Sequence, residues 1–290
     1  MDFEILPVGS QDLLGEGPCW ESALGRLTWV DIKGRRIRRA GLDGVEEDPI
    51  STPEDVGFAV PAEDGTLVVG LRSGVFSYSP ADGWRSLWAA DYDTHSHRIN
   101  DGKTDSRGRL WFGTMHDPET ESSSAFYRYD DKGVVRQFGD VTTSNGLGWS
   151  PDERTLYYTD SMTRCIFAFD VDADEGRLSN RRVFARDPDG YIPDGLTVDL
   201  DGGVWSAKWD GGRVVRYDPS GRLDLALELP VRRPTSVAFV GSDLRTLVVT
   251  SASLDRGPDE ALGGSVFLVP TRVQGREESV LRVPQPPRPA

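Results

Sequence analysis

The sequence predicts an all-β fold, a six-bladed β-propeller with four antiparallel strands in each blade. A turn followed by a short β-rich run recurs six times, and the spacings between successive runs are 40, 43, 46, 48 and 43 residues. That length is typical of a propeller blade. The 32 glycines and 19 prolines among 290 residues suit short strands joined by tight turns. The key aliphatic positions of the six runs are Leu27, Leu67, Leu110, Leu156, Val204 and Leu247.

Each unit is expected to contain the same four strands in the same order. The first strand ends in an acidic or proline-containing turn, as at 147–152, and the second contains the key aliphatic position. The third strand alternates with period two, as at 125–130, 165–170, 212–219 and 264–269, which is typical of a strand with one buried face. A weaker fourth strand follows, for example at 134–138. A two-domain α/β fold would need helical windows of period 3.6, and Gly, Pro or Asp-Gly interrupts nearly all of them.

Composition excludes several classes of function. We expect one domain over residues 1–290, with a proline-rich tail at 284–290. The 33 Lys+Arg and 47 Asp+Glu give a net charge of −14, which repels the phosphate backbone of a nucleic acid. No apolar run approaches the roughly 20 residues that span a bilayer, and the first residues do not resemble a secretory signal. Cys19 and Cys165 are expected to be buried thiols in a reducing compartment. We therefore expect a cytoplasmic protein without nucleic-acid or membrane partners.

Polar residues recur at one phase of the repeat. The innermost strand of a blade lies beside the central channel, and its start lies near one mouth of that channel. Counting back ten or eleven residues from the key positions reaches Glu16, Gly57, Asn100, Asn145, Asp194 and Ser236.

Three of these positions predict a metal site. Because equivalent positions of a cyclic fold converge on the axis, Glu16, Asn145 and Asp194 would meet in a small volume. Crowded carboxylates are unfavourable unless a cation or a proton lies between them. Oxygen ligands suit a hard divalent ion such as Ca²⁺, Mg²⁺ or Mn²⁺. The alternative is that the Asn-Gly and Asp-Gly pairs at 145–146 and 194–195 are ordinary turns.

A cation occurs at the same phase of the third unit. Arg98 precedes Asn100 at the expected channel mouth, where its guanidinium could hold a carbonyl or hydroxyl oxygen of a substrate. The alternative is a surface salt bridge between Arg98 and a nearby acid, with Asp91, Asp93 and Asp101 as the candidates.

The three histidines are not expected to form the main catalytic group. His95 and His97 could bind a metal together, but no third ligand is evident nearby. His116 begins the long loop 116–124 and is expected to line the pocket. Motifs for other chemistries are missing, because there is no Gly-x-Ser-x-Gly elbow and no glycine loop that leads from a strand into a helix.

At these residues the chain resembles regucalcin (senescence marker protein), gluconolactonase and related sugar lactonases, over roughly residues 12–270. The matching motifs are Leu-Gly-Glu-Gly-Pro at 14–18, Asn-Asp-Gly at 100–102, Gly-Arg-Leu-Trp-Phe-Gly-Thr-Met at 108–115, Ser-Asn-Gly-Leu at 144–147 and Pro-Asp-Gly at 193–195. Their order and spacing make the resemblance specific. The His-Asp pair at 116–117 most resembles the bacterial xylonolactonases.

The resemblance implies a six-bladed propeller with one divalent ion in its channel, which could be Ca²⁺, Zn²⁺, Mn²⁺ or Fe²⁺. The family motif implies that Glu16, Asn145 and Asp194 are the metal ligands. It also implies that Arg98 and Asn100 bind the substrate.

A loop carboxylate completes the site that the resemblance implies. In the family, a glutamate on the loop after Gly-Thr-Met also binds substrate. Glu119 is the candidate in this chain, and Asp117 is its rival because Pro118 occupies the position with the family spacing.

We therefore expect a divalent-metal-dependent hydrolase that opens a sugar lactone, of the gluconolactone or pentonolactone type, to the aldonic acid. The partner is a small-molecule lactone, and Asp194 is expected to act as the base for the attacking water as well as a metal ligand. One alternative is a non-catalytic, calcium-binding regulatory protein. The other is a metal-dependent arylesterase or phosphotriesterase. The oligomeric state is not predicted.

Overall fold

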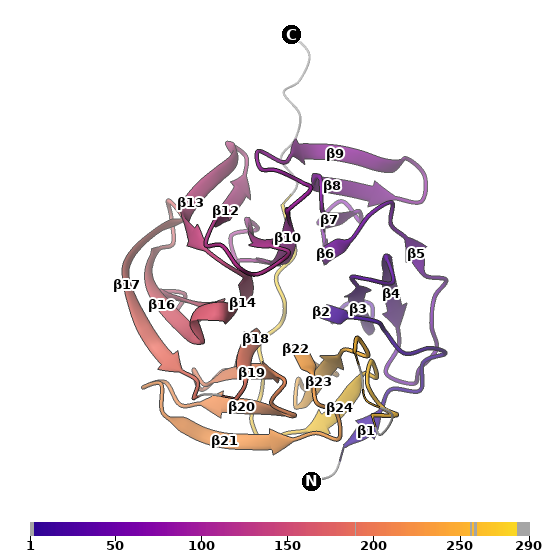
Figure 1. The fold of residues 1–290 in the computed structure, drawn as a ribbon. Coiled ribbons are helices and arrows are strands. Elements are labelled where there is room, and N and C mark those ends of the chain that lie inside the picture. The colour runs from indigo at the N-terminus through magenta and orange to yellow at the C-terminus, as the bar shows by residue number, and fades with distance from the viewer. Residues whose placement is uncertain (1–2, 189, 256, 258–259, 283–290) are drawn as a thin grey trace.

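The structure is a computed structural model that describes residues 3–188, 190–255, 257 and 260–282. In this part of the chain, six four-stranded antiparallel sheets surround a central axis (Figure 1). The predicted six-bladed propeller is therefore confirmed. The only helix among the described residues is the single 3-10 turn η1 (Ser161–Thr163), and no helix there is long and apolar enough to cross a membrane.

The strands of each blade follow one another outward from the axis. Blade 1 comprises β2 (Gly15–Glu21), β3 (Arg26–Asp31), β4 (Arg36–Ala40) and β5 (Ile50–Ser51), and blade 2 comprises β6 (Val56–Pro61), β7 (Leu67–Leu71), β8 (Gly74–Ser79) and β9 (Gly83–Ala89). Blade 3 comprises β10 (His97–Thr104), β11 (Leu110–His116), β12 (Ser124–Asp130) and β13 (Gly133–Val141), and blade 4 comprises β14 (Ser144–Trp149), β15 (Thr155–Asp160), β16 (Cys165–Asp172) and β17 (Arg177–Arg186). Blade 5 comprises β18 (Ile192–Val198), β19 (Val204–Trp209), β20 (Arg213–Tyr217) and β21 (Leu223–Glu228), and blade 6 comprises β22 (Pro234–Val240), β23 (Thr246–Ser251), β24 (Phe267–Pro270) and β1 (Glu4–Ile5).

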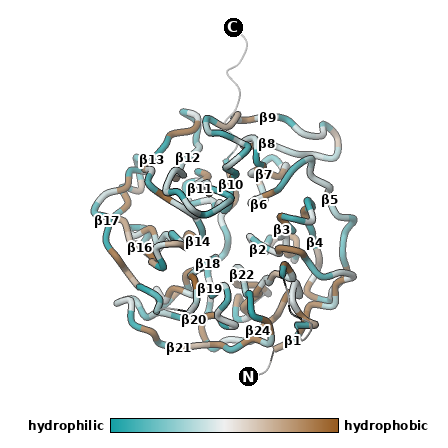
Figure 2. The backbone as a smooth tube through the Cα atoms, in the orientation of Figure 1, coloured by the Kyte–Doolittle hydropathy of each residue, from teal (hydrophilic) through white to brown (hydrophobic). Residues whose placement is uncertain are grey.

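The hydrophobic core lies between neighbouring blades. All six key aliphatic positions fall in the second strand of a blade and are at most 2 % exposed. Hydrophobic stretches occur in every blade (Figure 2), and they pack against the next blade. Phe112 of blade 3, for example, contacts Phe58 of blade 2 with ring centroids 6.3 Å apart. The repeated β-rich runs therefore supply both the strands and the surfaces that join the blades.

The N-terminal strand closes the ring. β1 pairs with β24 through Glu4 opposite Leu268 and Ile5 opposite Phe267, so the first strand of the chain is the outermost strand of the last blade. The predicted proline-rich tail at 284–290 lies outside the described residues. Cys19 and Cys165 are free and buried, as expected.

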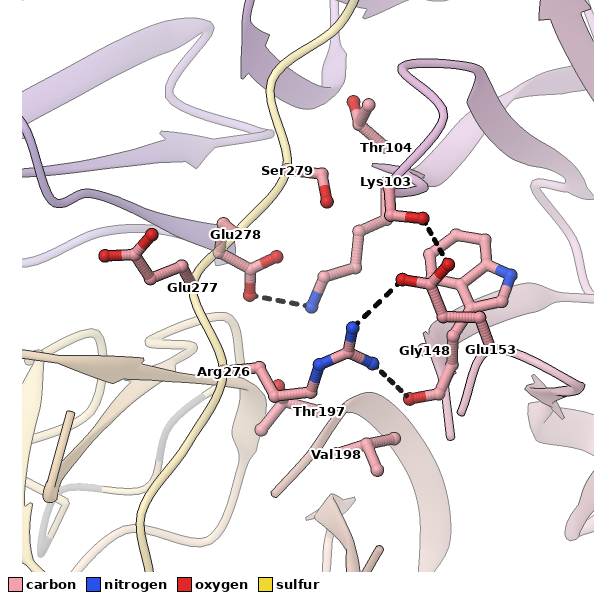
Figure 3. A pocket seen from close by; sticks show the side chains of 12 residues that line it. Lys103, Thr104, Gly148, Glu153, Thr197, Val198, Arg276, Glu277, Glu278 and Ser279 are labelled. Carbon is pink, nitrogen blue, oxygen red and sulfur yellow. Dashed lines mark hydrogen bonds and ion pairs between the residues drawn. The ribbon is translucent and has the colours of Figure 1, made fainter. Parts of the chain in front are cut away.

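A C-terminal segment, residues 275–281, crosses the end of the channel where the inner strands finish, and we call it the strap (Figure 1). Residues of the strap contact several blades. Glu278 accepts from Lys103 at 2.8 Å (Figure 3). Arg276 donates to the Ser150 carbonyl at 2.9 Å, and Leu281 forms a β-bridge with Ala62. The strap therefore covers the channel end opposite the candidate site.

Candidate active site

The sequence-predicted phase marks the same point in all six inner strands. Glu16, Gly57, Asn100, Asn145, Asp194 and Ser236 are each the second to fourth residue of the innermost strand, slightly later than the predicted strand start. At this point every inner strand shifts register against its neighbour in the blade. Such bulges redirect side chains, and here they occur where the polar residues face the axis.

Glycines next to the candidate ligands allow the inner strands to approach each other closely. A Cβ atom on Gly146 would lie 2.5 Å from the carbonyl oxygen of Asp194, and one on Gly195 would lie 2.1 Å from Ser236 Oγ. Both distances are shorter than real Cβ contacts, so larger residues would force the strands apart. The Asn-Gly and Asp-Gly pairs lie inside β14 and β18. The alternative that they form ordinary turns is therefore wrong.

A cavity of about 470 Å³ opens where the inner strands begin. It is lined by all of the predicted metal- and substrate-binding residues, from the expected blades. Those residues are Glu16, Arg98, Asn100, Glu119, Asn145 and Asp194.

The two candidate metal-binding carboxylates are buried side by side. Glu16 and Asp194 are 6 % and 5 % exposed. Burial raises the pKa of both carboxyls well above the ordinary range; the charge of Asp194 raises the pKa of Glu16 further, and those of Asp101 and Glu119 raise the pKa of Asp194. Asp194 Oδ1 has no hydrogen-bond partner among the described residues. An unpartnered carboxylate oxygen beside a second buried carboxylate fits a bound cation.

Asn145 lines the cavity beside the two carboxylates and is hydrogen-bonded on its nitrogen side. Its Nδ2 donates to Ser161 Oγ at 3.2 Å, and Ser161 Oγ donates to the Pro193 carbonyl at 2.8 Å. Asn145 also hydrogen-bonds to Asp194, and this bond lowers the pKa of that carboxyl. Among the described residues, no group of three or more His, Cys, Asp or Glu side chains could hold a metal. A metal centre here would therefore consist of two carboxylates and one carboxamide, which suits a hard dication.

Arg98 is a buried part of the site. Its Nε donates to Asp117 Oδ1 at 3.0 Å, and its Nη1 donates to Asn100 Oδ1 at 2.7 Å. Asn100 Nδ2 in turn donates to the Ser144 carbonyl at 2.8 Å. The side chain of Arg98 is only 5 % exposed. The alternative of a surface salt bridge to Asp91, Asp93 or Asp101 is wrong, because Arg98 is buried and pairs with Asp117.

The two loop acids differ in their surroundings. Asp117 is held by two arginines, since it also accepts from Arg72 at 2.5 Å. Glu119 accepts one hydrogen bond, from Thr143 Oγ1 at 3.0 Å, and adopts a left-handed backbone with φ of 56°. Both acids line the cavity, but Glu119 has more of its oxygen surface available to a ligand.

His116 does not line the cavity, so that prediction is wrong. Its Nδ1 accepts from the backbone N–H groups of Thr120 and Glu121 at 3.4 and 3.2 Å, which turns the ring into its own loop. His97 packs against His116 with ring centroids 5.1 Å apart. Both histidines therefore support the loop that carries the two acids.

The cavity lining also contains a set of apolar residues, here called the apolar wall, that was not predicted. The apolar wall comprises Leu14, Ile32, Ile192, Trp209 and Leu254. The guanidinium of Arg233 lies 4.5 Å from the Trp209 ring centroid and donates to the Leu254 carbonyl at 2.6 Å, so it braces the wall. Lys33 also lines the cavity. Trp209 is the last residue of a strand that repeats in every blade, so the repeat could have indicated its place at the cavity. Lys33 lies in a turn without a distinguishing pattern, so nothing in the sequence marked it.

Comparison with known proteins identifies the family of this chain. The model of the family described as SMP-30/gluconolactonase/LRE-like region matches residues 14–253, and the chain belongs to this family. A 6-deoxy-6-sulfogluconolactonase of Pseudomonas putida is 36 % identical, over 93 % of this chain and 96 % of that protein. A pentonolactonase of Haloferax volcanii is 34 % identical, over 91 % and 93 %. The crystal structure of a calcium-binding protein, regucalcin, from Agrobacterium tumefaciens superposes with a TM-score of 0.89 at 28 % identity, covering 94 % of this chain and 95 % of that one.

Proposed function

We propose that this protein is a divalent-cation-dependent hydrolase that opens a sugar lactone to its aldonic acid. The observation that carries the proposal is the convergence of two buried carboxylates, a carboxamide and a buried arginine, from four inner strands, on one cavity. Family membership and the lactonases among its relatives support the same reaction class.

Glu16, Asn145 and Asp194 are the residues that would hold the cation. When bound, a dication supplies Lewis-acid polarisation of the lactone carbonyl. It also offsets the repulsion between the two buried carboxylates.

The remaining chemistry belongs to side chains of this chain. Arg98 is held rigidly by Asp117 and Asn100, so it can orient a carbonyl or hydroxyl oxygen without further loss of rotamer freedom. Glu119 can accept a hydrogen bond from a ring hydroxyl. Asp194 can take the proton of the attacking water through the carboxylate oxygen that does not hold the cation. Water adds to the carbonyl carbon as Asp194 takes its proton. The ring C–O bond then breaks, and Asp194 returns that proton to the ring oxygen, which leaves as a hydroxyl.

The test is a lactone panel assayed with protein of known metal content. Protein freed of metal with chelator and reloaded with Ca²⁺, Mn²⁺, Zn²⁺ or Fe²⁺ should hydrolyse glucono- or xylonolactones only when loaded. Tight cation binding without hydrolysis would support a non-catalytic calcium-binding protein instead. Faster hydrolysis of an aryl ester than of any sugar lactone would support the arylesterase.

A further inference from the structure

Cations cluster around Asp55 beside the cavity. The Asp55 carboxylate accepts from Lys33 at 2.7 Å, from Arg72 at 3.1 Å and from Arg35 at 3.2 Å. Burial alone would raise the pKa of Asp55, but the hydrogen bonds and charges of these cations lower it to about 2. One carboxylate therefore pairs with three cations, and its single negative charge cannot neutralise all three.

The same network continues to Arg98 through Asp117. Arg72 joins the two carboxylates, because it also pairs with Asp117, which in turn pairs with Arg98. Four cations, Lys33, Arg35, Arg72 and Arg98, thus share two carboxylates, so this ion-pair network by itself has two cations more than anions. This surplus stands out in a chain whose net charge is −14.

Two of these cations, Lys33 and Arg98, line the cavity. Arg98 is committed to Asp117 and Asn100. Lys33 has three ammonium protons, donates one short bond to Asp55, and keeps a side chain that is 35 % exposed. It follows Ile32 of the apolar wall, so methylene groups of a ligand could lie on the wall while a charged end reaches the ammonium.

We propose that Lys33 is the centre of an anion-binding subsite that recognises an exocyclic sulfonate, phosphate or carboxylate on the lactone. The subsite rests on the proposed function and narrows its substrate class to lactones with an anionic substituent. An anion there would be paired with the surplus positive charge rather than desolvated against apolar side chains alone.

The test compares glucono-1,5-lactone with the same lactone carrying a sulfonate in place of its 6-hydroxyl. The metal-loaded wild type should show the lower KM for the sulfonated lactone. In Lys33→Met, the KM of the sulfonated lactone should rise roughly five- to thirtyfold relative to that of the neutral one. The preference should also shrink at high ionic strength.

Arg35→Met is the matched control. Arg35 pairs with the other oxygen of the same Asp55 carboxylate and its loss removes the same charge, but it does not line the cavity. It should change the KM ratio less than twofold. Equal ratios in wild type and Lys33→Met, or equal shifts in both variants, would overturn the subsite.

A binding measurement separates this proposal from the lactonase assignment. Calorimetry with gluconate and 6-phosphogluconate should show tighter binding of the phosphorylated acid, and Lys33→Met should abolish the difference. If the wild type hydrolyses neither lactone but keeps this difference, the lactonase assignment fails and the subsite stands. If Lys33→Met weakens both acids equally, Lys33 recognises the product carboxylate and the exocyclic assignment is wrong.

Discussion

Replacing Asp194 with asparagine should lower the hydrolytic activity and raise the stability of the metal-free protein, so two measurements with opposite expected signs test the centre of the site. The substitution keeps the shape of the side chain but removes its charge and its capacity to act as a base. Hydrolysis of the preferred lactone should fall by at least about two orders of magnitude, the usual contribution of a general base. At the same time, the metal-free protein should become more stable near neutral pH, because one of two adjacent buried carboxylates no longer ionises.

The pH dependence of that gain follows from the direction of the pKa shifts. Glu16 and Asp194 have pKa values raised in the folded protein. A carboxyl whose pKa is raised in the folded protein keeps a proton that the unfolded chain has already released. The free energy of unfolding is therefore greatest at low pH and falls as the pH rises toward the pKa of the folded state. The loss is about 1.4 kcal/mol per pH unit for each extra proton.

The pH dependence of stability should be measured in the window between about pH 6.5 and 7.5. Burial first raises the pKa of Asp12, Asp101 and Asp160 to about 6, so these groups have titrated below the window. Burial lowers the pKa of Lys208 to about 8, and that group acts with the opposite sign above the window. Within the window, the stability of the metal-free wild type should fall with pH more steeply than that of Asp194→Asn.

The assay is urea unfolding in chelator at several pH values, together with lactone hydrolysis and metal content for the loaded protein. Asp255→Asn is the matched control, because Asp255 also lines the cavity but its side chain is 88 % exposed. Its unfolding curve should stay parallel to that of the wild type. Parallel curves for Asp194→Asn, or near-normal hydrolysis, would refute the assignment of Asp194 as base and ligand.

Three further variants test other parts of the site. Arg98→Ala should lower kcat/KM for hydroxylated lactones roughly tenfold to a hundredfold while metal content stays unchanged, and loss of the metal would contradict its role in substrate binding. Trp209→Ala should raise KM roughly tenfold with little change in kcat, whereas Trp209→Phe should retain most of the binding; an equal effect of both would argue against an aromatic contact. Gly146→Ala should destabilise the fold by about 1–3 kcal/mol in urea unfolding, since its Cβ would lie 2.5 Å from the Asp194 carbonyl, and an unchanged midpoint would mean that the inner strands can separate freely.

The sequence alone was sufficient for the fold and for the polar side of the cavity, because both depend on local periodicity. Leu27, Leu110 and Leu247 repeat because every blade needs the same buried residue in its second strand. Glu16, Asn145 and Asp194 recur at one phase of that repeat, and cyclic closure brings one phase to one place. Their roles as ligands remain predictions.

Contacts between blades, and the path of single loops, required the tertiary structure. Asp117 pairs with Arg98 because the loop after β11 folds back over β10, and His116 turns away because backbone N–H groups of that loop bind its ring. Lys33 meets Asp55 across the boundary between blades 1 and 2. Such pairs depend on loop conformation and on how neighbouring blades are placed, and neither leaves a periodic pattern in the sequence.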